Sequence, residues 1–191
     1  GDPDLIVPSE PYTMSADGQD KWWEPIVDTG LTEERWVQAI EMKPSFPMGR
    51  KVVHHAIARL DQEEDGVTGL AAGIDADDDI GPGTFMEWAV GKVGEIFPES
   101  AGKLMLPGAR IQWDVHYHAI GEEVKNDVIE LGIYFYPKGY VPKYRTILHF
   151  MRAHQGGAET GSIDIPPGEV TVTQGFTVLK APARLENYQP H

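Results

Sequence analysis

Short stretches in which apolar and polar residues alternate recur along the chain, and Gly- and Pro-rich turns separate them. Such stretches are typical of β-strands, because neighbouring side chains of a strand point to opposite faces. The segment 32–42 also fits a helix capped by Thr32, but Trp36, Val37 and Ile40 favour a strand. The pattern predicts one all-β domain, a sandwich or a barrel. The predicted strands are 4–8, 34–42, 51–60, 109–120, 127–137, 144–151 and 169–179.

The alternation is clearest in residues 109–120, ARIQWDVHYHAI. His116 and His118 lie two residues apart in this segment, and two imidazoles at that spacing on one strand face can reach a common metal ion. The alternative is an exposed polar strand face that carries two histidines by chance. One face of this strand is predicted to carry Ile111, Trp113, Val115 and Tyr117, and the other Gln112, Asp114, His116 and His118.

Two adjacent histidines, His54 and His55, interrupt the apolar run KVVHHAIARL at residues 51–60. In a regular strand one imidazole would enter the core and the other would face water. A β-bulge would instead re-aim the side chains, so that both rings could serve one metal ion. The sequence alone leaves both arrangements open.

Composition limits the chemistry of such a site. The 191 residues contain no cysteine, which excludes disulfides and thiolate ligands. An imidazole-rich site without thiolates suits Cu, Zn, Fe or Ni. The net charge of −14, without a Lys/Arg cluster, argues against a nucleic-acid partner. No apolar run approaches the length of a membrane span.

The segments RWVQAIEMKP, KVVHHAIARL and IQWDVHYHAIG, in this order, resemble the type II copper, ascorbate-dependent monooxygenases. This family includes the peptidylglycine α-hydroxylating and dopamine β-monooxygenases, and the chain is most similar to the first, amino-terminal copper domain of its bacterial branch. The resemblance implies a two-sheet antiparallel jelly-roll β-sandwich over residues 1–182. It also implies that His54, His55 and His116 bind one copper ion, with His118 as the substitute for His116.

The same resemblance implies an oxidoreductase role. The three-histidine copper would relay electrons from ascorbate or another reductant. A second copper domain, in the same polypeptide or a partner chain, would complete the O₂-dependent hydroxylation of a C–H bond. Residues 183–191, with the ending LENYQPH, look like the entrance to that domain, and His191 would match its first histidine ligand. We therefore expect a fragment or processed product, located in the periplasm or outside the cell. Asp114 is a candidate acceptor for a ligand imidazole, or else a solvated carboxylate.

Three other interpretations remain open. His116, His118 and Glu122, with Gly108 upstream, have the form of a cupin half-motif for a single metal ion, but no second half-motif follows. A non-catalytic copper-binding or structural sandwich of an extracellular assembly would also fit. Asp75, Asp77 and Asp79 resemble part of a Ca²⁺ loop, although Ile80 and Met86 break the EF-hand pattern, so a solvated acidic loop is the alternative.

Overall fold

The structure, a computed structural model, describes residues 1–64, 83–147, 154–155, 158–159, 165–172 and 182–186. The chain divides into two compact units. The described part of the first unit comprises residues 1–64 and 83–147. In the second unit, β14 (His154–Gln155) pairs antiparallel with β15 (Ala158–Glu159).

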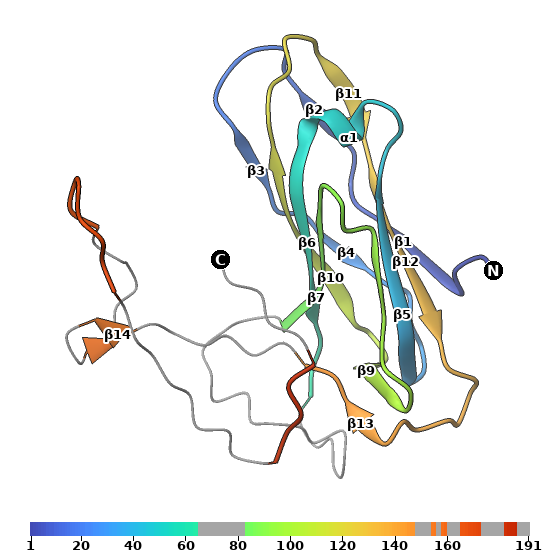
Figure 1. Cartoon of the computed structure of the whole chain (residues 1–191). Coiled ribbons are helices and arrows are strands. Elements are labelled where there is room, and N and C mark those ends of the chain that lie inside the picture. Colours follow the sequence, from blue (N-terminus) through green and yellow to red (C-terminus); the bar gives the residue numbers. More distant parts are fainter. Residues whose placement is uncertain (65–82, 148–153, 156–157, 160–164, 173–181, 187–191) are drawn as a thin grey trace. The chain divides into compact units, whose positions relative to one another are not determined.

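The first unit is built mainly from two large sheets (Figure 1). The first sheet has the strand order β1-β12-β5-β9-β13, and β8 also pairs with β5. All of its pairs are antiparallel except β9 with β13. Its strands are β1 (Leu5–Pro8), β5 (Arg35–Pro44), β8 (Gly94–Ile96), β9 (Ala101–Met105), β12 (Ile129–Phe135) and β13 (Tyr144–Arg145).

The second sheet has the order β3-β10-β6-β7 and is antiparallel throughout. Its members are β3 (Lys21–Trp23), β6 (Val53–Asp61), β7 (Gly83–Ala89) and β10 (Arg110–Tyr117). A further strand, β4 (Ile26–Asp28), pairs with the first half of β10, whereas β3 pairs with its last residues. The short helix α1 (Gly49–Val52) leads directly into β6, and β2 (Tyr12–Met14) pairs with β11 (Val124–Asp127).

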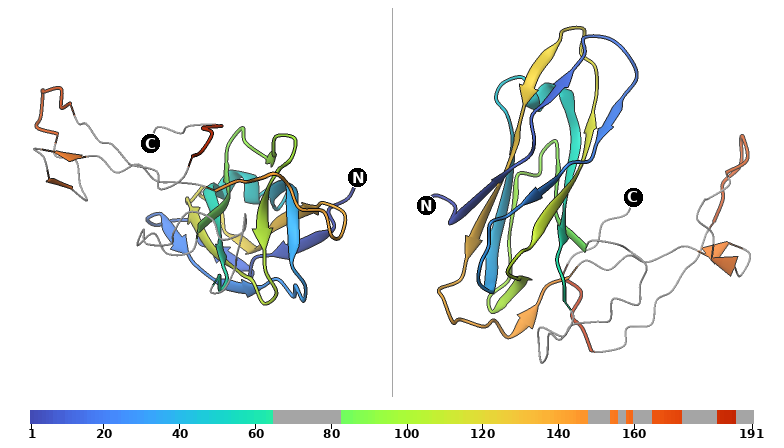
Figure 2. Two further views of the ribbon diagram at one scale, coloured as in Figure 1. Left: turned by 90° about the horizontal axis from the view of Figure 1, so that it is seen from below. Right: turned by 180° about the vertical axis from the view of Figure 1, so that it is seen from behind.

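One hydrophobic core joins the two sheets, which face each other in Figure 1 and Figure 2. Ile40 of β5 and Leu131 of β12 belong to the same buried cluster as Trp113 of β10 and Ala56 of β6. This shared core confirms the predicted all-β sandwich; the jelly-roll connection of its strands stays a prediction. Burying both inner faces supplies the main stabilisation of such a fold, because each sheet has one apolar face.

Several sequence predictions can be compared with the described residues. Residues 35–44 form strand β5, as predicted, and not a helix. Within the predicted strand 144–151, only Tyr144–Arg145 is a strand among the described residues, and residues 169–172 of the predicted strand 169–179 have no strand structure. In the part of the chain that the structure describes, no helix has the length and apolarity needed to cross a membrane.

Candidate metal centre

The two adjacent histidines lie at an irregularity at the start of β6. Along β10, His116 is paired with His55, but the next residue, Tyr117, is paired with Val53, so the register shifts past His54. One extra residue on one strand is the signature of a β-bulge, which turns two successive side chains towards the same face. Val53 and Ala56 are therefore both buried, while both imidazoles between them lie outside the core.

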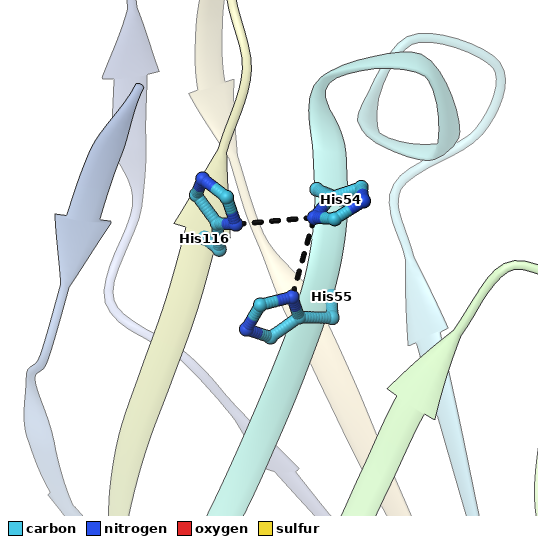
Figure 3. Close-up of side chains that lie close together, drawn as sticks. All are labelled: His54, His55 and His116. Atoms are coloured by element: carbon cyan, nitrogen blue, oxygen red, sulfur yellow. Dashed lines mark hydrogen bonds between the residues drawn. The ribbon is translucent and has the colours of Figure 1, made fainter. Parts of the chain in front are cut away.

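The bulge brings His54 and His55 next to His116, which projects from β10 (Figure 3). The Nδ1 atom of His54 lies 3.1 Å from Nδ1 of His116 and 3.3 Å from Nδ1 of His55. Nitrogen ligands about 2.0–2.1 Å from a tetrahedral metal ion lie roughly 3.3–3.4 Å from one another. The two distances from His54 are thus close to those of a metal-ligand set, and one nitrogen of each of the three imidazoles lies within 4.8 Å of the others.

A carboxylate fixes the orientation of one of these rings. Nε2 of His116 lies 2.8 Å from Oδ2 of Asp20, and Nδ1 of His118 lies 2.8 Å from Oδ1 of the same carboxylate. These two hydrogen bonds, with His118 first, lower the pKa of Asp20, so that the carboxylate remains ionised. When His116 donates its Nε2–H to Asp20, its Nδ1 atom presents a lone pair to the other two imidazoles.

The protons available within the cluster cannot satisfy all of its contacts. Nδ1 of His54 contacts two other Nδ1 atoms, and it carries at most one proton. With neutral rings, and with His116 presenting a lone pair, at least one of these two contacts lacks a properly directed hydrogen bond. Burial, followed by the neighbouring imidazoles, lowers the pKa of His55 and favours its neutral form. Neutral imidazoles with converging lone pairs are the form that binds a metal cation.

Behind the cluster, a buried polar contact connects three segments of the chain. The hydroxyl of Tyr117 donates to Oδ2 of Asp127 at 2.9 Å, and the hydroxyl of Ser45 donates to Oδ1. Asp127 is 1% exposed and Tyr117 is completely buried. This contact ties the end of β10 to β11 and to the loop before α1, next to the residues that form the bulge.

Among the described residues, no other predicted site residue joins the three imidazoles. His118 lies just beyond the end of β10 and contacts Asp20, and Glu122 is an exposed turn residue. Asp114 forms an ion pair with Arg59 at 3.2 Å, so the acceptor for His116 is Asp20 and not Asp114. His191, and Asp75, Asp77 and Asp79 of the predicted calcium loop, lie outside the described residues.

Sequence reasoning missed two residues that contact His116, namely Asp20 and Trp22. Trp22 belongs to β3 and is paired with His116 of β10, and Asp20 directly precedes this strand. The indole of Trp22 is stacked on the imidazole, with ring centroids 4.2 Å apart and an angle of 10° between the rings. The only local signal is an aspartate two residues before a tryptophan, a spacing that places both side chains on one face of a strand.

Comparison of the sequence with protein-family models and with curated proteins gives no match.

Proposed function

We propose that the β-sandwich binds one copper ion through Nδ1 of His54, His55 and His116. The convergence of these three nitrogen atoms from a β-bulge and a neighbouring strand is the observation that supports this proposal most strongly. The donor set suits copper, because imidazole binds copper well and the chain offers no thiolate. Zinc would accept the same three ligands, so the choice of copper also rests on the resemblance of the histidine segments to the type II copper monooxygenases.

The role we propose is electron transfer within a monooxygenase of this type. Bound copper would supply one-electron redox chemistry. The contribution of the protein is to hold three imidazoles together before the metal arrives, and Asp20 keeps the tautomer of His116 that exposes Nδ1. Hydroxylation of a substrate C–H bond by O₂ would need a second copper domain, in the same polypeptide or a partner chain. A periplasmic or extracellular location is part of the same proposal.

The cupin alternative has less support from the geometry. A cupin half-motif would need the side chains of His116 and His118 to converge on one metal ion. In the structure, Nδ1 of His118 is hydrogen-bonded to Asp20, and the imidazoles closest to His116 are those of His54 and His55. A cupin-like site also leaves unexplained why the β-bulge at the start of β6 places His54 and His55 beside His116.

Metal titration tests the proposal. We expect the protein to bind one equivalent of copper, whether Cu(II) or Cu(I) is added. The electron paramagnetic resonance spectrum of the Cu(II) form should show coupling to nitrogen. Repeated reduction by ascorbate and reoxidation should leave the copper bound. Stable binding without reversible reduction would favour a non-catalytic copper-binding module. A preference for Zn²⁺ in direct competition with Cu(I), or the absence of tight binding, would contradict the proposal.

A further inference from the structure

The position of Trp22 is unusual for a large aromatic residue. Its side chain is on the outer face of the second sheet, and the residue is 58% exposed. The next residue, Trp23, is half-buried and its ring packs against Tyr12. One face of the indole lies flat against His116. Since a short strand gains little stability from an exposed indole, this contact indicates what Trp22 contributes.

Trp22 and Asp20 contact His116 on the sides that the imidazoles of His54 and His55 leave free, and all four residues lie against its ring. The side chain of His116 points to the outer face, as do those of His54 and His55, yet only 9% of this residue is exposed. Asp20 is bonded to Nε2 at one edge of the ring, and the indole covers one ring face. The imidazole is thus restrained against both rotation in its plane and tilting out of it.

We propose that Trp22 is a positioning residue, which acts through His116 and holds the Nδ1 atom of this imidazole towards His54 and His55. This inference rests on the proposed metal site, because it assigns Trp22 a role in the readiness of that site. A ligand that is fixed before binding loses less conformational entropy when the metal arrives. Residues that orient metal ligands typically change metal affinity by about 10- to 100-fold when they are removed.

The test compares three variants of the full chain. Trp22→Leu removes the flat ring, whereas Trp22→Phe keeps an aromatic face on His116. Ile26→Ala is the matched control, since Ile26 is also an exposed apolar residue on a short strand that pairs with β10. Cu(II) and Cu(I) affinities are measured by competition with a chelator. In addition, ¹⁵N NMR of the histidine rings reports the tautomer and mobility of His116 in the metal-free protein.

We expect Trp22→Leu to weaken copper binding by about 10- to 100-fold, to change the Cu(II) spectrum and to broaden the His116 ring signals. Trp22→Phe and Ile26→Ala should remain close to the original protein in all three measurements. Unchanged His116 signals and copper affinity in Trp22→Leu would overturn the inference, even if the variant unfolds at a lower urea concentration. Since the NMR measurement needs no metal, a failure of copper binding in the unmodified protein would be recognised separately.

Discussion

The buried hydrogen bond between Tyr117 and Asp127 offers a sharp test of how the end of β10 is held. Tyr117→Phe removes one hydroxyl and keeps the ring, which is stacked on Tyr12 with centroids 4.6 Å apart. Asp127 then retains the hydroxyl of Ser45 but loses the donor at 2.9 Å from Oδ2. The variant therefore changes one polar contact in a fully packed environment.

The magnitude follows from the burial of both partners. A hydrogen bond to a charged group contributes about 1.5–3 kcal/mol to stability. Because the carboxylate is 1% exposed and water cannot easily replace the lost donor, we expect a loss of about 2–3 kcal/mol. For a domain of this size, such a loss lowers Tm by roughly 4–12 °C.

Urea denaturation measures this loss directly. We expect a lower midpoint with an unchanged m-value, which indicates a change in stability and not in compactness. Tyr12→Phe is the control, because the hydroxyl of Tyr12 has no hydrogen-bond partner among the described residues. A difference below about 0.5 kcal/mol between Tyr117→Phe and the unmodified protein would refute the reasoning, since that is the range of neutral surface substitutions.

The same variant has a distinct pH signature. Burial, followed by the charge of Asp127, raises the pKa of Tyr117. In the unfolded chain a tyrosine ionises near pH 10, so above this pH the unfolded state binds fewer protons than the folded state. The contribution of Tyr117 to the free energy of unfolding is thus fully present below about pH 10 and declines above this pH. The stability difference between the unmodified protein and Tyr117→Phe should shrink accordingly.

Three further predictions concern single side chains. Burial lowers the pKa of Lys103 to about 8 from 10.5, so the unfolded chain binds more protons between these values. Urea denaturation should therefore show that the free energy of unfolding rises from pH 8 to 10.5. This contribution should be absent in Lys103→Met. Asp20→Asn should weaken copper binding by about 10- to 100-fold in chelator competition, whereas His118→Ala should leave it nearly unchanged. Gly49→Ala would press a methyl group against Asp127 and Ser45, and calorimetry should show a loss of about 1–3 kcal/mol.

Local sequence patterns predict the inner and outer faces of β10 well. Ile111, Trp113, Val115 and Tyr117 are all completely buried, as their alternation indicates. The bulge of β6 also has a local signature, because two polar residues separate Val53 from Ala56, and both of these apolar residues are buried. Both features depend on residues close together in the chain, so periodicity predicts the faces of β10, whereas it leaves the bulge of β6 as one of two possible arrangements.

The contacts of His116 depend instead on pairing between distant segments. Asp20 is 96 residues away from His116, on a segment next to the three-residue strand β3, which is too short to show periodicity. Asp114 is the acceptor for His116 that the local sequence suggests, but it lies two positions along the same strand, about 6.6 Å from His116. Its carboxylate is 3.2 Å from Arg59 on the neighbouring strand instead.

Alternation alone also predicts strand structure at residues 169–172, where the structure has none. Val170 and Val172 alternate with polar residues, yet they are 92% and 77% exposed and belong to no strand. A strand needs a hydrogen-bonded neighbour and a surface that covers its apolar face. No sequence pattern within residues 169–172 specifies such a partner.

The copper content of the purified protein, after exposure to copper and removal of the excess, tests the central claim most directly. The measurement compares the unmodified chain with His55→Ala and with His118→Ala, which removes a histidine outside the three-imidazole cluster. We predict about one copper ion per chain in the unmodified protein and in His118→Ala, and a loss of tightly bound copper in His55→Ala. Copper that persists in His55→Ala but disappears in His118→Ala would contradict the proposed site.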